Sequence, residues 1–318
     1  MSAHKTSAVV DENEPLDVLF VLHPKFNLLD WAGPWEVFQT ALHDVNDPGT
    51  SPRIYPPTLA PVPHVFQADQ LSNATETKAF DCTIAADEKN ILSDQDVSIV
   101  GQIPYKQAYE DLKNYDVLVV VGGNTEEIIE KEAEPLGLIS AFAELQKADP
   151  VRERTLFSVC TGSHFLAHKG ILAGLSATTH PNHITKFEIL CSRAATRDLD
   201  ERTDVQEGVR YVVNNLRFDL GDEDENPYIR RKSDARRPSN ARKGSISLRG
   251  SSTRENIARR AAKRLGGLRV ITSGGVSAGT DAALYLVGAL VSDDSANAVA
   301  HSLQWTWQKG LVVDGVDV

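Results

Sequence analysis

The stretch LFSVCTGSHFLAHKG, residues 156–170, places Cys160 where a short apolar run gives way to a helical pattern. The apolar run is typical of a buried parallel strand, and Gly162 suits the tight turn that would follow it. A thiol at such a point is either a small core side chain or a nucleophile on a sharp strand-to-helix turn. The local pattern leaves both interpretations open.

Strand-to-helix units recur on both sides of this stretch. Strands are predicted over 16–22, 117–121, 155–159, 209–214 and 268–273, with helices over 136–148, 276–291 and, last, 295–308 with Trp305 and Trp307. Gly33 and Pro34 indicate the start of the first helix. Residues 64–112 are expected to hold irregular structure, hairpins and one short helix. This alternation predicts an α/β, doubly wound, mostly parallel sheet with helices on both faces.

Composition excludes several classes of protein. No apolar run of the 318 residues approaches the roughly 20 needed to span a bilayer, and the N-terminus lacks the hydrophobic segment of a secretory signal. We expect residues 1–15 to be flexible and 16–318 to form a single domain. The three cysteines have no regular spacing, which argues against a disulfide framework or a zinc site and favours a reducing, cytoplasmic setting.

Charge is unevenly distributed along the chain. Tyr228–Arg269 contains 14 basic and 2 acidic residues, a local charge of +12, which leaves −23 for the rest of a chain whose net charge is −11. Residues 219–266 are therefore predicted to be an acidic-then-basic, disordered insertion into the domain. The runs RRKS, RRPS and RKGS resemble basophilic kinase sites and end at Ser233, Ser239 and Ser245. Because no recognition motif accompanies the charge, we expect no nucleic-acid partner.

Four ordered motifs carry a resemblance to a known family. They are FNLLDWAGPWEVF, DVLVVVGGN, SVCTGSHFLAHKGILAGLSATTHP and RVITSGGVSAGTDAALYLV. Together they resemble the ThiJ/PfpI superfamily, which has a glutamine amidotransferase-like, flavodoxin-like fold with a cysteine at the nucleophile elbow. The resemblance covers most of residues 16–310 and implies that Cys160 is the nucleophile. It also implies a homodimer.

Details within the motifs are similar to the isonitrile hydratase branch. That branch carries an aspartate in an LD-x-x-GP turn and a Cys-Thr pair at the elbow, which correspond here to Asp30 and Cys160-Thr161. The glyoxalase branch tends to have glutamate in place of Asp30, and the PfpI peptidase branch histidine in place of Thr161. The same motifs occur in ligand-sensing domains of AraC-type activators, which continue into a helix-turn-helix region. This chain ends at Val318, so we expect no such region.

The resemblance implies a mechanism for a small-molecule substrate. Cys160 would attack the terminal carbon of an isonitrile, and Asp30 would move protons to give an N-substituted formamide. The helix that follows Cys160 is expected to favour its thiolate. Backbone N–H groups at Gly123 and Thr161 would stabilise developing charge. From the residues alone, Asp30 is better interpreted as a turn residue or a cap of the helix that begins near Pro34.

Two other functions stay open at this stage. A glyoxalase-like enzyme would convert 2-oxoaldehydes with Cys160 and His180, the histidine of the TTHP stretch, which is otherwise a structural residue. A non-enzymatic sensor would report oxidation or ligand binding at Cys160. His164 and His168 are interpreted as packing or surface residues. The sequence predicts no cofactor and no metal site, since GGVSAG lacks the spacing of a phosphate loop.

Overall fold

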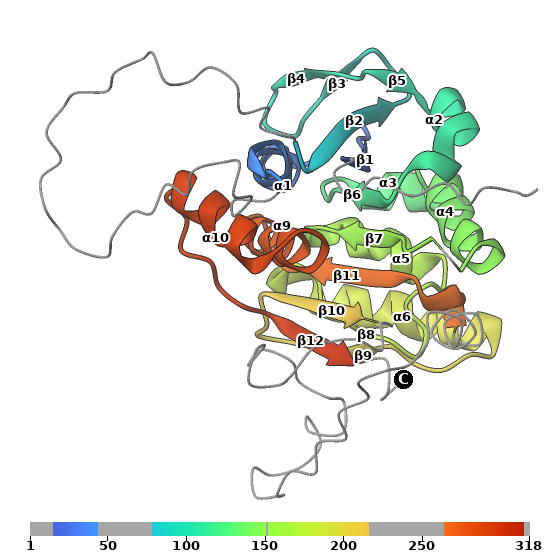
Figure 1. The fold of residues 1–318 in the computed structure, drawn as a ribbon. Helices are drawn as coiled ribbons and strands as arrows, with labels where there is room; N and C mark the ends of the chain where they lie inside the picture. Colours follow the sequence, from blue (N-terminus) through green and yellow to red (C-terminus); the bar gives the residue numbers. More distant parts are fainter. Residues whose placement is uncertain (1–14, 44–77, 151, 216–263, 315–318) are drawn as a thin grey trace, which may run out of the picture.

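The central feature of the computed structural model, which describes residues 15–43, 78–150, 152–215 and 264–314, is one large sheet (Figure 1). Its strands are β1 (Leu16–Val21), β2 (Phe80–Ala86), β5 (Ile103–Pro104), β6 (Val117–Val120), β7 (Thr155–Ser158), β10 (Tyr211–Asn215), β11 (Arg269–Ser273) and β12 (Leu311–Asp314). Their spatial order is β12-β10-β11-β7-β6-β1-β2-β5. Neighbours pair in parallel, except that β10 runs antiparallel to β11. The predicted mostly parallel sheet is confirmed.

Two small sheets lie outside the large one. β3 (Asn90–Leu92) pairs antiparallel with β4 (Ser98–Val100), and β8 (Ser176–Ala177) pairs in parallel with β9 (Asp204–Val205). Residues 64–112 were expected to contain hairpins and one short helix, and the described part of that region contains the β3–β4 hairpin and α2 (Tyr105–Asp111). The expectation missed β2, which pairs along its length with β1.

Helices cover both faces of the sheet, as predicted. One face carries α1 (Leu28–Thr40), α9 (Ser277–Leu290) and α10 (Asp293–Ser302). The other carries α2, α3 (Thr125–Glu130), α4 (Leu136–Ala148), α5 (Ser163–His168) and α6 (Ile184–Asp198). Short 3₁₀ segments are η2 (Leu112–Asn114), η3 (Cys160–Gly162), η4 (Pro181–His183) and η5 (Arg264–Gly267). In the described part of the chain, no helix is both long and apolar enough to cross a membrane.

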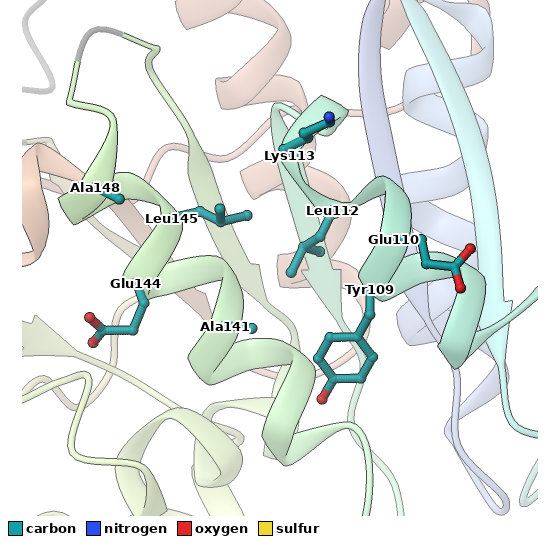
Figure 2. A pocket seen from close by; sticks show the side chains of 8 residues that line it. All are labelled: Tyr109, Glu110, Leu112, Lys113, Ala141, Glu144, Leu145 and Ala148. Carbon is teal, nitrogen blue, oxygen red and sulfur yellow. The ribbon is translucent and has the colours of Figure 1, made fainter.

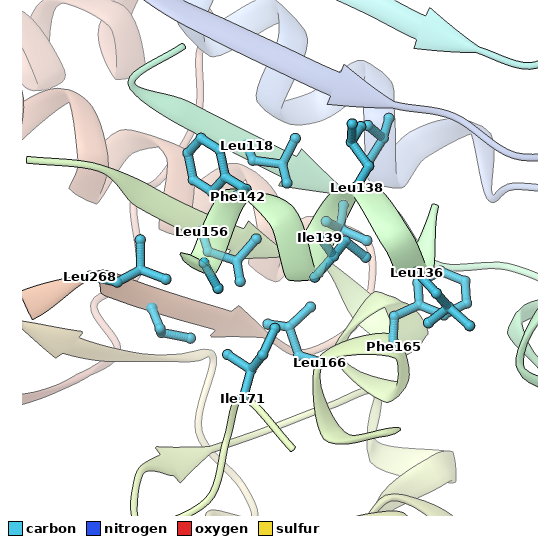
Figure 3. Packing of buried hydrophobic residues seen from close by; sticks show 14 of the residues in the cluster. Leu118, Leu136, Leu138, Ile139, Phe142, Leu156, Phe165, Leu166, Ile171 and Leu268 are labelled. Carbon is cyan, nitrogen blue, oxygen red and sulfur yellow. The ribbon is translucent and has the colours of Figure 1, made fainter. Parts of the chain in front are cut away.

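Side chains of the sheet alternate between two hydrophobic cores. In β1, Val18 and Phe20 face the α1–α9–α10 layer, whereas Leu19 and Val21 face the α2–α6 layer. This alternation follows from the period-2 geometry of a strand and explains why β1 is apolar throughout. Figure 3 shows the second core, where Phe142 of α4 lies close to Leu118 and Leu156 of the sheet. Each such side chain contributes about 1.5–3 kcal/mol when it is fully buried.

The first helix begins earlier than the sequence indicated. The prediction took Pro34 as its first turn, but α1 starts at Leu28 and contains Pro34 in its interior. The reason is that Asn27 acts as the N-cap: its side chain accepts a hydrogen bond from the N–H of Leu29 at 3.4 Å. The earlier start places Asp30 in the first helical turn, where a negative charge is favoured.

The last helix is shorter than predicted. It ends at Ser302, and Trp305 and Trp307 lie in the extended segment that leads to β12. Both indole N–H groups donate to Asp281 of α9, one to its carboxylate and one to its backbone oxygen. A continuous helix could not deliver both indoles to one residue, and Gln304 adopts a positive φ of 51° that ends the helix.

Several sequence-based predictions fall outside the described residues. They are the kinase-like sites at Ser233, Ser239 and Ser245 and residues 1–14 of the N-terminal segment. Of the predicted insertion 219–266, only residues 264–266 are described, and these belong to η5, with Leu265 buried.

Candidate functional site

The elbow after β7 gives Cys160 an unusual backbone conformation. Its φ is +57°, a value that costs energy for any residue with a side chain, and strain of this kind clusters at functional sites. The turn also needs Gly162, because a Cβ at that position would lie 2.6 Å from the carbonyl oxygen of Val120. The N–H of Cys160 donates to the carbonyl of Gly274 at 3.0 Å. The strand, turn and helix thus hold the thiol at the carboxyl end of the sheet.

Asp30 reaches the same point from α1. Its side chain is fully buried. A Cβ on Gly122, at the end of β6, would lie 2.8 Å from Asp30 Oδ2, 2.7 Å from Thr161 Oγ1 and 2.8 Å from Thr161 N. The ends of β6 and β7 and the first turn of α1 therefore converge where only glycine fits. The structure brings Asp30, Cys160 and Thr161 together.

The electrostatics of Asp30 and Cys160 are coupled. Burial raises the pKa of Asp30 to about 7, against the opposing effects of the Cys160 thiol and the N–H of Gly122. Burial, followed by the charge of Asp30, raises the pKa of Cys160 to about 12, although the N–H of Thr161 acts in the opposite sense. The expected preference for thiolate at the helix start is thus outweighed by burial. Burial therefore favours the protonated thiol of Cys160 and moves the pKa of Asp30 toward neutral pH.

The contact between these two groups is close without being an ideal hydrogen bond. Neither Asp30 oxygen has a partner with full hydrogen-bond geometry, although the thiol and the Gly122 amide lie near enough to shift its pKa. A buried carboxyl without well-aligned donors is costly, and native structures rarely keep one without a purpose. Its two oxygens are available to accept or donate a proton.

The hydroxyl of Thr161 ties the elbow to the neighbouring turn. It accepts a hydrogen bond from the N–H of Gly123 at 2.9 Å and lies 3.2 Å from the carbonyl oxygen of the same residue, to which it donates. The amide of Gly123 is therefore engaged, whereas the amides of Gly122 and Thr161 face Asp30 and Cys160. Sequence reasoning assigned charge stabilisation to Gly123 and overlooked Gly122, its neighbour in the VVVGGN stretch.

His180 lies near the elbow but has other partners. Its Nδ1 accepts a hydrogen bond from the N–H of Asn182 at 3.2 Å, so the neutral ring carries its proton on Nε2. A Cβ on Gly275 would lie 2.6 Å from its Cδ2, so the ring packs closely on that turn. Burial, then the charge of His183, lowers its pKa. Cys160 is not among the groups that affect this pKa, and no hydrogen bond joins the two side chains.

The segment that carries His180 is nonetheless attached to the elbow. The hydroxyl of Thr179 donates to the carbonyl of Cys160 at 3.1 Å, a contact that sequence reasoning did not anticipate. As predicted for packing and surface residues, His164 is buried with its ring stacked on Phe187, and His168 pairs with Glu132. Among the described residues, no group of three or more histidine, cysteine or acidic side chains is arranged to hold a metal ion.

A groove lies elsewhere on the molecule, between α2 and α4 (Figure 2). It has a volume of about 490 Å³ and is lined by Tyr109, Glu110, Leu112, Lys113, Ala141, Glu144, Leu145 and Ala148. None of the candidate site residues contributes to it. The constellation around Cys160, rather than this groove, is the candidate active site.

Comparison with known proteins agrees with this architecture. The model of the DJ-1/PfpI family matches residues 64–213. Drosophila melanogaster DJ-1beta is 14% identical over 92% of this chain and 100% of its own, with a TM-score of 0.50. An AraC family transcriptional regulator from Pseudomonas putida is 16% identical over 91% of this chain and 100% of its own, with a TM-score of 0.49. A THiJ/PfpI family protein from Pseudomonas syringae is 15% identical over 96% and 82%, with a TM-score of 0.47.

No curated protein matches the sequence. The family match nevertheless includes the elbow at Cys160, and the structural likeness to DJ-1beta extends over the parallel sheet that positions it. The part of the chain from residue 64 to residue 213 therefore matches the DJ-1/PfpI family, and the fold is similar to that of DJ-1beta.

Proposed function

We propose that the protein is a cysteine-dependent hydratase that converts a small isonitrile into an N-substituted formamide. The observation that carries the proposal is the buried Asp30 carboxyl beside the protonated thiol of Cys160, with its pKa raised to about 7. A general base works best when its pKa lies near the working pH. A thiol that must lose its proton as it attacks needs such a base in contact with it.

The first half of the reaction forms a covalent intermediate. Asp30 takes the proton of the Cys160 thiol while the sulfur attacks the terminal carbon of R–N≡C. The same proton is then delivered from Asp30 to that carbon, which gives the thioimidate Cys–S–CH=N–R. Nothing else is consumed, because the isonitrile carbon accepts both the sulfur and the proton. Ionised Asp30 is needed to begin this step, and protonated Asp30 to complete it.

The second half releases the product. Asp30 takes a proton from a water molecule that adds to the C=N carbon and passes this proton to the nitrogen, which gives Cys–S–CH(OH)–NH–R. The C–S bond then breaks, Asp30 transfers the proton of the hydroxyl group to the sulfur, and R–NH–CHO leaves. The amides of Gly122 and Thr161 face the reacting groups and are placed to stabilise the charge that develops there. Donors held rigidly in a buried site contribute more than they would in water.

The experiment is turnover of cyclohexyl and aryl isonitriles, followed as the appearance of formamide. Cys160→Ala removes the nucleophile and is expected to abolish turnover. Asp30→Asn keeps the shape but not the base, and is expected to lower kcat by about 10²- to 10⁴-fold. Glu36→Gln, an exposed carboxyl on the same helix α1, and Cys191→Ala, a buried free thiol on α6, are the matched controls.

Other results would point to the rival functions. Turnover of 2-oxoaldehydes without turnover of isonitriles would contradict the hydratase and favour the glyoxalase-like enzyme. An absence of turnover with either class, together with rapid oxidation of Cys160, would favour the sensor.

Two further expectations accompany the proposal. We propose a homodimer, for which light scattering of the full chain is the test, and a cytoplasmic location. The described cysteines, Cys82, Cys160 and Cys191, are all buried free thiols, an arrangement compatible with a reducing compartment.

A further inference from the structure

The turn between β11 and α9 is hydrogen-bonded to the elbow at Cys160. The N–H of Cys160 donates to Gly274 at 3.0 Å, and the N–H of Gly274 donates to the carbonyl of Arg210 at 2.9 Å. Arg210 immediately precedes β10, which pairs antiparallel with β11. The backbone of Cys160 is thus connected, through a single intervening residue, to Arg210.

The side chain of Arg210 holds the other end of the same turn. Its Nη2 donates to the hydroxyl of Ser277, the first residue of α9, at 3.0 Å. Its Nε donates to Oδ2 of Asp281 at 2.8 Å, and Nη2 contacts that oxygen as well. Ser277 and Asp281 are four residues apart on α9 and so lie on one face of the helix. Arg210 therefore fixes the turn at Gly274 with its backbone and at Ser277 with its guanidinium.

Asp281 is itself held rigidly. It is fully buried, and its second oxygen accepts hydrogen bonds from the indole of Trp305 at 2.8 Å and from the N–H of Gln308 at 3.0 Å. A buried carboxylate with this many donors has little freedom to move. The carboxylate of Asp281 therefore fixes the position of the Arg210 guanidinium, because Asp281 would not move if the Gly274–Ser277 turn were displaced.

Two close contacts extend this support to the reacting groups. A Cβ on Gly279 of α9 would lie 2.6 Å from Val159, the residue before Cys160. A Cβ on Gly33 of α1 would lie 2.4 Å from the hydroxyl of Thr280. The start of α9 therefore touches both the strand end that carries Cys160 and the helix that carries Asp30.

We propose that Arg210 is a positioning residue for Cys160, acting through the Gly274–Ser277 turn. The inference rests on the proposed role of Cys160 as the nucleophile. The thiol must keep a fixed distance from Asp30 in a strained backbone conformation, and its N–H has one anchor, Gly274. A small displacement of a reacting group costs a large factor in rate. A loosened turn would therefore change the reactivity of Cys160 before it changed the fold.

The test measures Cys160 directly as well as through turnover. Arg210→Lys keeps a cation for Asp281 but loses the planar fork, and Ser277→Ala removes only the contact to Nη2. Ser277→Thr keeps the hydroxyl and serves as the rescue variant. The control is Asp116→Asn at the amino end of β6, where Asp116 binds Arg152 and the N–H of Asp17 far along the strand from the elbow. Iodoacetamide labelling of the Cys160 peptide is followed by mass spectrometry across pH 6–10, beside melting temperature, kcat and KM.

We expect Arg210→Lys and Ser277→Ala to change the labelling rate of Cys160 and to lower kcat by about tenfold, with KM nearly unchanged and the pH profile of labelling displaced. Ser277→Thr is expected to restore both, and Asp116→Asn to lower only the melting temperature. The inference is wrong if Arg210→Lys and Ser277→Ala melt earlier but label like the wild type. Labelling of Cys160 does not require an isonitrile. If the wild type is labelled but does not turn over isonitriles, the proposed function is refuted, and the labelling rates of the variants still decide whether Arg210 positions Cys160.

Discussion

Two buried carboxyl groups lie on adjoining helices of the same layer, yet their surroundings are opposite. Asp281 of α9 receives the guanidinium of Arg210, an indole N–H and a backbone N–H. Asp30 of α1 is equally inaccessible, and neither of its oxygens has a well-aligned partner. Burial by itself therefore does not identify a reactive carboxyl. What distinguishes Asp30 is that neither of its oxygens accepts a well-aligned hydrogen bond and that the Cys160 thiol lies beside it.

The largest effect should come from the pH dependence of stability at Asp30. Its pKa rises from an ordinary value of 3.8 to about 7, so the folded protein binds a proton that the unfolded chain has already lost in this range. Stability therefore falls as pH rises from about 4 to about 7, and the ionised carboxyl costs on the order of 4 kcal/mol above pH 7. Asp30→Asn removes this cost, so we expect the variant to gain stability at pH 8 but not at pH 4.

Urea denaturation of the wild type and of Asp30→Asn at pH 4, 5, 6, 7 and 8 measures this difference. Glu36→Gln on the same helix is the control and should follow the wild type. A parallel fall of both proteins between pH 4 and 7 would mean that Asp30 is satisfied in the folded state, and the contrast with Asp281 would disappear.

Asp281→Asn should have the opposite effect. It leaves the guanidinium of Arg210 without its counter-ion in a partly buried position. We expect this to cost about 3 kcal/mol at pH 7, at the lower end of the usual range for buried pairs because Arg210 is partly exposed. Denaturation at pH 7 gives the value, and Asp281→Asn combined with Arg210→Met should recover part of it. A loss of less than about 1 kcal/mol would place the pair among ordinary surface ion pairs.

Local patterns in the sequence predict some elements of the fold correctly and miss others. The strands at 117–121 and 155–159 were predicted because continuous apolar runs mark strands buried on both faces, and α4 was predicted over residues 136–148, the span that it occupies. β2 was missed because Asp81 and Thr83 interrupt its apolar pattern. The first helix was placed too late because Pro34 was taken as its start, whereas the cap is Asn27.

The two carboxyl groups, Asp30 and Asp281, also differ in how far the sequence identifies them. Only the resemblance identifies Asp30 as a catalytic candidate, since its local pattern by itself favours a turn residue or a helix cap. Nothing in the sequence marked Asp281, because its partner Arg210 is 71 residues away and the pairing depends on the antiparallel placement of β10 beside β11. The low pKa expected for Cys160 from its helix was also wrong, because burial is not visible in a local motif.

Gly33→Ala tests the close contact between α1 and α9. A Cβ at this position would lie 2.4 Å from Thr280 Oγ1, so the substitution should force α1 away from α9 and cost about 1–3 kcal/mol. Thr280→Ala removes the obstructing hydroxyl, and the double variant should regain most of the loss. If Gly33→Ala were neutral alone, the spacing between Asp30 and Asp281 would not depend on this contact.

The smallest effect on stability is expected at Thr161. Thr161→Val keeps the shape of the side chain but leaves the N–H of Gly123 without its hydrogen bond, at a cost of about 1 kcal/mol. The same variant frees the Gly122–Gly123 turn that lies against Asp30, so we expect kcat to fall by about tenfold, more than the stability loss alone would suggest. Thr161→Ser keeps the hydroxyl and should behave like the wild type in both measurements. Equal, small losses of stability and activity in Thr161→Val would indicate that the region around Asp30 tolerates movement, whereas the region around Asp281 does not. A large loss of activity with little loss of stability would show that this end of the sheet is organised for chemistry, while the Asp281 region is organised to hold it in place.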